Sequence, residues 1–256
     1  MTNEAYHNSY GISSSDFRLL EESPMHLDNK ALFKLSGKQF TLGSLVHAMV
    51  LEPEIVEEEF VREDFDGCDL NKNTKAYKAA KADWLKTTGG KVIVSNDDWI
   101  QAMKMTENVL AIAGNLLQNG VAEESLFVED TEFGIIRKCR PDYYREDLGI
   151  VIDLKTTKDS SDRSFANSIV NFNYHRQASW YIDTLQMANK KVDRFVFIMV
   201  DTQKPYMVRI RELGKASIQV GQEDYRKHLE TYREYKENDV GIDIKTVNIP
   251  EWILED

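Results

Sequence analysis

The chain has 256 residues, of which 42% are hydrophobic and 29% charged, as in an ordinary globular protein with one sizeable core. No stretch approaches the roughly 20 apolar residues of a membrane helix, and the first ten residues, MTNEAYHNSY, lack the basic and apolar regions of a secretory leader. Two cysteines, Cys68 and Cys139, are too few for a disulfide framework. We therefore expect a cytoplasmic protein that does not bind a membrane.

The net charge of −11 argues against a basic coat protein for DNA, because phosphate binding leaves a lysine and arginine footprint. It does not exclude a metal-dependent nuclease, since bound cations invert the field of an acidic pocket. Charge is also segregated: residues 52–69 hold nine acids and one base, whereas residues 137–158 hold six bases and four acids. The basic segment carries the motif described below.

The first half of the chain is predicted to be mostly helical. Ser13 to Asp16 caps a helix over FRLLEES that closes at Pro24, and residues 41–51 have apolar side chains at helical spacing. The acidic stretch after Pro53 is expected to be strand and loop. Two further helices, 75–87 and 96–118, surround a short strand with the sequence VIV.

The period then changes to that of strands. ESLFVED, IIRKCRPDYY and IVIDLKTT are predicted to form a three-strand antiparallel meander. Helices are expected over 160–172 and 174–185, followed by the strands RFVFIMV and PYMVRIREL, within the C-terminal region 193–238 that ends in a charged helix from about 215. The tail with Pro250 and Trp252 is unassigned. The pattern indicates an α/β fold, one domain over 1–256 with a mixed β-sheet flanked by helices.

The last hairpin of the meander brings two aspartates together. If its turn is centred between Asp147 and Leu148, Asp142 faces Asp153, with Cβ atoms roughly 4.5–5.5 Å apart. Two carboxylates so placed form a natural site for a hard cation such as Mg²⁺. A bulge would shift this register.

Lys155 leaves the same strand face as Asp153, while the intervening Leu154 points to the other. An ammonium there can orient a metal-bound water and stabilise charge on a phosphoryl group. The alternative is a solvated hairpin, because the pattern D-x-K is common by chance. The buried character of Ile150 and Ile152 and the preceding Arg-Pro-Asp favour the catalytic interpretation.

Three further residues are candidates for the site. His47 falls to one side of the apolar stripe of its helix, so it is a candidate metal ligand, with a surface histidine as the alternative. Gln177 and Tyr181 share a helix face at a spacing of four. Gln177 could hold a phosphate or a metal-bound water, and Tyr181 could pack beside the site. The alternative is a helix whose aromatic residues only dock on the sheet.

These pieces occur in an order that resembles the PDDEXK (restriction-endonuclease-like) nuclease superfamily, and within it the RecE-like (exodeoxyribonuclease VIII) exonucleases of phages and prophages. The matching motifs are GSLVH (43–47) with LEP, RPD (140–142), DLKTT (153–157) and QASWY (177–181). The opening segment YHNSYGISSSDFRLLEESPMH is also similar, so that the resemblance spans residues 6 to about 185, with the core motifs within 41–185.

The resemblance implies a Mg²⁺-dependent exonuclease, with Mn²⁺ as a substitute, that degrades one strand of linear double-stranded DNA from 5′ to 3′. It implies His47, Asp142 and Asp153 as metal ligands, the Leu154 carbonyl as a further one, Lys155 as the group that activates water, and Gln177 and Tyr181 in support. Glu123 matches an acidic position loosely. Implied partners are DNA ends, a RecT-like single-strand annealing protein and copies of the chain in a ring. The acidity of the chain leaves the DNA path unidentified.

Two other functions remain open. A related nuclease with an iron–sulfur cluster needs about four cysteines, which this chain lacks, but a cluster-free endonuclease or single-strand exonuclease is compatible with the motifs. An inactive module that keeps the fold for binding DNA or protein is the second alternative. The presence of Asp142, Asp153 and Lys155 together favours an active enzyme.

Overall fold

The computed structural model describes residues 1–33 and 42–237. The α-helices are α1 (Asn3–Asn8), α2 (Phe17–Glu22), α3 (Pro24–Asp28), α4 (Leu42–Leu51), α5 (Val56–Glu59), α6 (Lys75–Leu85), α7 (Asn96–Ala113), α8 (Asp162–Asn171), α9 (Tyr174–Met187) and α10 (Lys215–Glu237). The strands are β1 (Phe60–Arg62), β2 (Val92–Val94), β3 (Val121–Ala122), β4 (Leu126–Asp130), β5 (Ile135–Cys139), β6 (Tyr143–Arg145), β7 (Ile150–Thr157), β8 (Arg194–Asp201) and β9 (Val208–Glu212). No helix in these ranges is long and apolar enough to cross a membrane.

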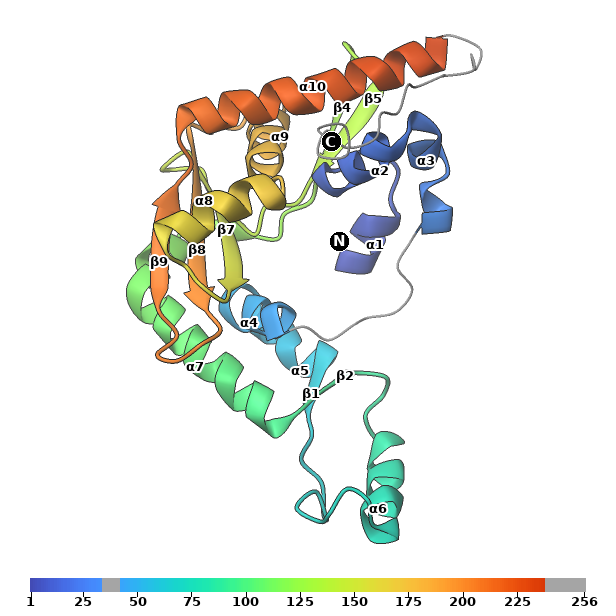
Figure 1. The fold of residues 1–256 in the computed structure, drawn as a ribbon, viewed down its shortest axis with the longest axis vertical. Coiled ribbons are helices and arrows are strands. Elements are labelled where there is room, and N and C mark those ends of the chain that lie inside the picture. Colours follow the sequence, from blue (N-terminus) through green and yellow to red (C-terminus); the bar gives the residue numbers. More distant parts are fainter. Residues whose placement is uncertain (34–41, 238–256) are drawn as a thin grey trace, which may run out of the picture.

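A mixed five-stranded sheet with the order β3-β6-β7-β8-β9 forms the centre of the molecule. Strands β7 and β8 run parallel, and the other neighbours are antiparallel. Helices α4 and α7 pack on one face of the sheet, and α8 and α9 pack on the other with α10 lying across α9 (Figure 1). The predicted α/β fold with a helix-flanked mixed sheet is confirmed.

Strand β7 is buried on both faces because both layers of helices cover it. Ile150, Ile152 and Leu154 enter the core against α4 and α7, whereas Val151 enters the core against α9. This alternation is the one predicted from the sequence. The alternation places the polar Asp153 on the α9 side of β7, where helices shield the strand from solvent.

The predicted three-strand meander is wrong as a single sheet. Strands β4 and β5 pair with each other in a separate two-stranded sheet, and β6 and β7 belong to the central one. The break falls at Arg140–Pro141, between β5 and β6. Proline has no N–H to give to a strand ladder, so the long predicted strand divides there and its two halves diverge.

Other predicted elements need smaller corrections. Pro24 begins α3 instead of only closing α2, with Ser23 as the N-cap. The stretch after Pro53 forms 3-10 turn Pro53–Ile55 and the short α5 before β1. Helix α1 was not predicted. Thr41, the first residue of the expected 41–51 helix, and the unassigned tail with Pro250 and Trp252 lie outside the described residues.

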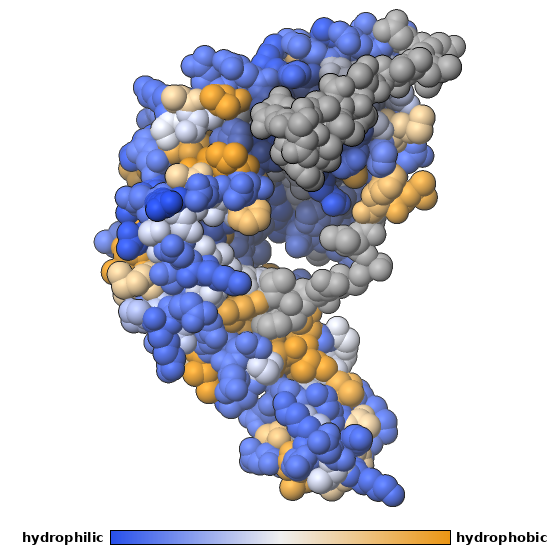
Figure 2. All heavy atoms as spheres, in the orientation of Figure 1, coloured by the Kyte–Doolittle hydropathy of each residue, from blue (hydrophilic) through white to orange (hydrophobic). Residues whose placement is uncertain are grey.

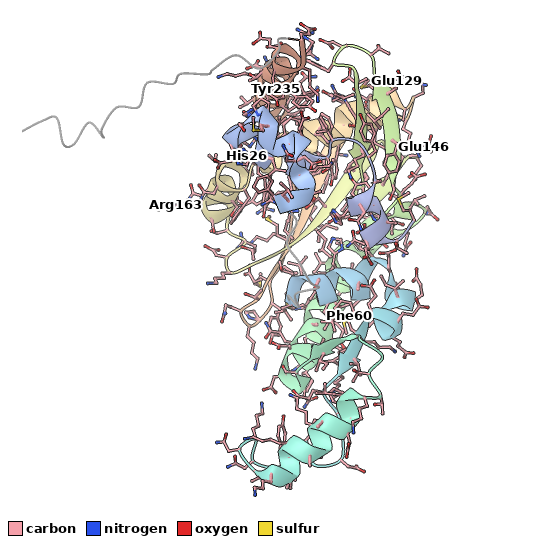
Figure 3. The ribbon with its side chains drawn as sticks, turned by 90° about the vertical axis from the view of Figure 1, so that its right-hand side faces the viewer. His26, Phe60, Glu129, Glu146, Arg163 and Tyr235 are labelled. Atoms are coloured by element: carbon pink, nitrogen blue, oxygen red, sulfur yellow. The ribbon has the colours of Figure 1, made fainter. Side chains whose placement is uncertain are left out.

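The chain between β1 and β2 forms a lobe that projects from the body of the molecule, below the position of Phe60 (Figure 3). The rings of Phe65, Tyr77 and Trp84 pack together inside it. The face of the lobe seen in Figure 2 is mainly hydrophilic, with a few apolar side chains among the polar ones. Helix α6 and its flanking turns therefore form a small unit with a core of their own.

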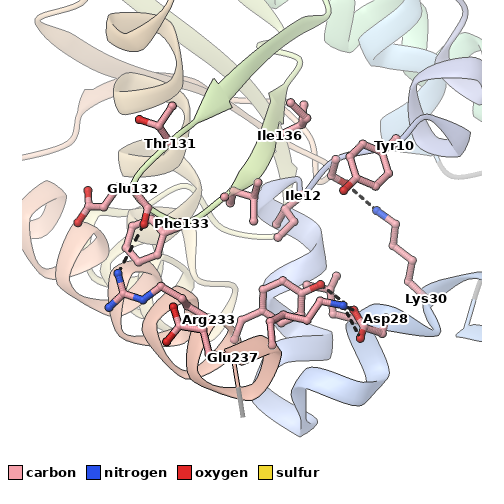
Figure 4. A pocket seen from close by; sticks show the side chains of 16 residues that line it. Tyr10, Ile12, Asp28, Lys30, Thr131, Glu132, Phe133, Ile136, Arg233 and Glu237 are labelled. Atoms are coloured by element: carbon pink, nitrogen blue, oxygen red, sulfur yellow. Dashed lines mark hydrogen bonds and ion pairs between the residues drawn. The ribbon is translucent and has the colours of Figure 1, made fainter. Parts of the chain in front are cut away.

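A cavity of about 670 Å³ lies between α3, the β4–β5 hairpin and the end of α10 (Figure 4). Ile12 and Phe133 contribute to its apolar wall, and charged side chains such as Lys30 and Arg233 surround it. None of the predicted site residues lines it, so the site must be sought elsewhere.

Candidate active site

The hairpin of β6 and β7 has the register that the sequence predicts. Tyr143 pairs with Ile152, so Asp142 and Asp153 are the next residues along the two strands. Strand β6 begins at Tyr143, directly after Pro141 and Asp142. The backbone N–H of Leu154 is consequently not used by the β6 ladder, and it donates instead to Asp142 Oδ2 at 2.7 Å.

Asp153 and Lys155 form an ion pair on the α9 side of β7, with Asp153 buried and the Lys155 side chain 23% exposed. Lys155 Nζ lies 2.7 Å from Asp153 Oδ2, and Asp153 is only 1% exposed. Burial raises the pKa of Asp153 to about 6, against the opposing effect of Lys155. Burial lowers the pKa of Lys155, but Asp153 and Asp142 raise it by more, so the amine stays an ammonium.

Helix α4 places His47 against the end of β6. His47 Nε2 lies 2.7 Å from Asp142 Oδ2, and its Nδ1 lies 3.4 Å from Glu123 Oε1. Burial lowers the pKa of His47, but the carboxylates of Asp142 and Glu123 outweigh it and raise the pKa to about 9. The predicted position of His47 off the apolar stripe is confirmed, because Leu45 and Val46 are fully buried and its side chain is 29% exposed.

Glu123 joins this group directly after the short strand β3. Its backbone is left-handed, with a φ of 52°, and its N–H donates to the Asp142 carbonyl at 3.2 Å. Arg140 Nε donates to Glu123 Oε2 at 2.5 Å. Burial and the nearby Asp142 raise the pKa of Glu123 to about 7. The left-handed turn thus aims the carboxylate at His47.

One donor atom each from His47, Glu123 and Asp142 lies within 4.8 Å of the others. Carboxylate oxygens suit Mg²⁺ and Mn²⁺, and an imidazole nitrogen favours Mn²⁺ over Mg²⁺. The two carboxylates and the imidazole therefore fit a divalent cation.

The predicted site residues are thus brought together in two adjoining groups. His47 and Asp142 meet Glu123 at the end of β6, while Asp153, Lys155 and Gln177 meet between β7 and α9. The predicted ligand Asp153 lies outside the close three-donor group of the described residues. Leu154 connects the two groups through its N–H, and the carbonyl proposed as a ligand belongs to this same residue.

Gln177 and Tyr181 lie on the face of α9 that meets β7. Gln177 Nε2 donates to Asp153 Oδ1 at 3.1 Å, and its side chain also hydrogen-bonds Tyr181. Tyr181 is buried, with its ring 6.3 Å from that of Phe195. Burial raises the pKa of Tyr181, so its phenol is neutral. Gln177 thus holds the Asp153 carboxylate, and Tyr181 holds Gln177 while its ring packs in the core between α9 and the sheet.

The basic segment around the motif is used for internal pairing. Arg137 pairs with Asp130, and Arg140 pairs with Glu123. Lys138, only 2% exposed, donates to the carbonyls of Tyr6 at 2.9 Å and Ser9 at 3.0 Å. Lys138 of β5 thus holds the N-terminal segment in position, and Arg140, directly after β5, holds the Glu123 carboxylate.

The chain belongs to the family described as "PDDEXK-like domain of unknown function (DUF3799)", whose model matches residues 13–242. No curated protein matches the sequence. A solved structure from Eubacterium rectale, named "Putative exonuclease", is similar over 100% of this chain and 98% of its own, with a TM-score of 0.58 and 14% identity.

A phage related exonuclease from Haemophilus somnus 129PT matches over 79% of this chain and 96% of its own, with a TM-score of 0.36 and 14% identity. Of these two scores, that of the Eubacterium rectale structure is high enough to indicate a shared fold. The PDDEXK membership predicted from the motifs is confirmed by the family and by that fold.

Proposed function

We propose that this protein is a divalent-metal-dependent DNA exonuclease. The observation that carries the proposal is the meeting of His47, Glu123 and Asp142 within 4.8 Å, beside the ion pair of Asp153 and Lys155. Hydrolysis of a phosphodiester needs a cation at the phosphoryl oxygens and a positioned water, and these two groups offer places for both. Membership of the PDDEXK-like family supports the same chemistry.

In this proposal His47, Glu123 and Asp142 hold the cation, Mg²⁺ or Mn²⁺, with Asp153 and the Leu154 carbonyl as further ligands. When bound, a divalent cation supplies Lewis-acid stabilisation of the phosphoryl oxygens and lowers the pKa of a ligated water. Lys155 contributes a permanent positive charge, fixed by Asp153, that orients the attacking water and faces the developing negative charge. Gln177 and Tyr181 keep the Asp153 carboxylate oriented toward the site.

The finer activity follows from the resemblance to RecE-like enzymes. The proposed substrate is the end of linear double-stranded DNA, degraded from 5′ to 3′ to leave 3′ single-strand overhangs. The overhangs would be passed to a RecT-like annealing protein in phage-type recombination, and the enzyme would work as a ring of copies. At 14% identity the structure named "Putative exonuclease" shares the fold with this chain, and because endonucleases also have this fold, the choice of an exonuclease rests on the RecE-like motifs.

Digestion of linear duplex labelled at either the 5′ or the 3′ end tests this activity, with Mg²⁺, Mn²⁺ or EDTA. We expect early release of the 5′ label as mononucleotide and none in EDTA. Cutting of a closed circle would instead identify an endonuclease, and digestion confined to single strands would identify a single-strand exonuclease. Binding of DNA without any cleavage would identify the protein as an inactive module that keeps the nuclease fold.

Variants assign the roles within the site. Lys155→Met and Asp153→Asn are expected to lower the cleavage rate by about 100-fold or more, because each removes a charge from the proposed site. Asp153→Asn should largely spare DNA binding. His47→Ala is expected to raise the metal concentration needed for activity. Cleavage at the parent rate by Lys155→Met would contradict the assignment of the lysine.

A further inference from the structure

The turn between α8 and α9 presents apolar side chains to solvent beside Lys155. Phe172 is 65% exposed and Val170 is 66% exposed. The ring centroids of Phe172 and Tyr174 lie 5.6 Å apart, and Lys155 Nζ lies 4.9 Å from the centre of the Tyr174 ring. An aromatic surface therefore extends from the solvent to the ammonium of the proposed active site.

This surface is held in place by the fold. Asn173 adopts a left-handed conformation, with φ of 54°, and its N–H donates to the Val170 carbonyl at 3.2 Å. The Phe172 N–H donates to the Ser168 carbonyl at 3.0 Å, and the ring of Tyr174 packs against Phe197 at 5.6 Å. The exposed ring of Phe172 thus belongs to a closed, hydrogen-bonded turn whose other side is part of the core.

We propose that Phe172 and Tyr174 form a stacking surface for the nucleobase next to the phosphodiester that is cleaved. The inference rests on the proposed nuclease function. Aromatic side chains stack on bases of any sequence, and an ammonium attracts the phosphate to which the base is joined. A nucleotide carries a base and a phosphate close together. The base matches the rings of Phe172 and Tyr174, and the phosphate matches the ammonium of Lys155 beside them.

A nucleic acid is favoured over a protein partner for this patch because of Lys155. An apolar protein surface covering Phe172 would also bring apolar groups toward the ammonium of Lys155, whose side chain is 23% exposed and has Asp153 and the Tyr174 ring beside it. Desolvating a charge without a further anion is unfavourable. A strand of DNA places a phosphate there and leaves its base free to stack.

The test compares Phe172→Ala, Phe172→Trp and the control Ile112→Ala. Ile112 is 62% exposed on α7, on the other side of the sheet, so its removal deletes a comparable apolar surface elsewhere. The probe is a single-stranded oligonucleotide with 2-aminopurine near its 5′ end, in Ca²⁺ or EDTA so that it is not digested. We expect quenching of 2-aminopurine by the parent protein.

Phe172→Ala is expected to lose the quenching and to bind roughly 5-fold to 150-fold more weakly, the effect of removing one stacked base. Phe172→Trp should restore both readouts, and Ile112→Ala should change neither. In Mg²⁺, Phe172→Ala should raise KM for DNA and leave kcat at saturating DNA unchanged, because Lys155 and the metal ligands are untouched.

Unchanged quenching and affinity in Phe172→Ala would overturn the proposal, as would an equal effect of Ile112→Ala. A changed sedimentation coefficient with unchanged DNA affinity would assign the patch to contacts between copies and also overturn it. If the parent cleaves DNA while Phe172→Ala keeps the parent's quenching and affinity, the nuclease function stands and the stacking surface is rejected. If the parent quenches but never cleaves, the stacking surface survives and the nuclease function falls.

Discussion

At Asp142, one carboxylate oxygen meets two partners that have different roles. Oδ2 accepts the Leu154 N–H at 2.7 Å and lies 2.7 Å from His47 Nε2. Burial opposes ionisation, but His47 and Lys155 lower the pKa of Asp142 below its usual range. The Asp142 side chain therefore accepts the Leu154 N–H in place of a carbonyl of a neighbouring strand. It also supplies negative charge to the candidate metal site with His47 and Glu123.

Glu123 should bind the metal, and its neighbour in sequence provides the control. Glu123→Gln keeps the size of the side chain but removes the charge that faces His47, so we expect metal affinity to fall by about 10-fold or more. Glu124→Gln removes a charge that pairs with Lys190 at 2.8 Å, outside the donor group, and should leave metal affinity unchanged. Calorimetric titration with Mn²⁺ measures both. Equal affinities in the two variants would remove Glu123 from the site.

The sequence allowed prediction of the residues on β7 and not of Glu123, for a physical reason. Strand parity fixes the relation of Asp153 to Lys155, and the hairpin register follows from the turn. Glu123 reaches His47 only through a two-residue strand and a left-handed backbone at a non-glycine residue. Neither feature produces a periodic pattern, so the loose motif match was the only signal.

At the scale of elements, the contact between α9 and α10 fixes the position of Gln177 and Tyr181. It depends on Gly221, where an added Cβ would lie 2.2 Å from the His175 carbonyl oxygen and 2.7 Å from Ser179 Oγ. Gly221→Ala must therefore push the helices apart, which we expect to lower the free energy of unfolding by about 1–3 kcal/mol.

Gly114→Ala is the matched control for that substitution. Gly114 has a helical φ of −55°, and nothing lies within 4 Å of an added Cβ, so alanine there should be neutral or stabilise by about 0.4–1 kcal/mol. Urea denaturation of both variants measures the difference. Equal stability of the two would show that α9 and α10 separate without cost.

The lobe between β1 and β2 should loosen in acid because of Glu63. Its carboxylate accepts hydrogen bonds from Lys81 at 2.5 Å and Tyr77 at 3.0 Å, and the bond from Lys81 chiefly lowers its pKa. A lowered folded pKa contributes stability at neutral pH that disappears as the pH falls through it. We expect the parent to show faster hydrogen exchange of residues 63–91 only in acid. Glu63→Gln should show the same faster exchange already at neutral pH. Glu107→Gln, an exposed change on α7, should have no effect there.

Element types were predictable from periodicity, whereas sheet membership was not. The strands around 135–145 and 150–157 were expected in one meander, and the structure divides the first at Pro141. An isolated proline can mark an edge, a bulge or a break, and the sequence alone does not choose among them. The parallel pairing of β7 with β8 likewise depends on the crossover through α8 and α9, which local patterns do not report.

At the scale of the whole molecule, an acidic protein must concentrate its cations if it is to hold DNA. The cations nearest the site are buried in internal pairs, as at Arg137 and Arg140. The lobe, residues 63–91, carries six lysines and five acids, and the charges are divided along it: residues 63–69 hold four of the acids, whereas residues 70–91 hold all six lysines and one acid. Lys75 and Lys78 are exposed on α6, with no ion pair among the described residues.

Lys75→Gln with Lys78→Gln should therefore weaken binding of duplex DNA in a salt-dependent manner. Removing one phosphate-binding lysine reduces the slope of log affinity against log salt by about 0.9, so the double variant should lower it by about 1.8. Lys215→Gln with Lys227→Gln makes the same charge change on exposed positions of α10 and should leave the slope unchanged. Anisotropy of a labelled duplex in EDTA, over a salt series, measures both pairs. If the two double variants shift the slope equally, only net charge matters, and DNA does not contact the lobe.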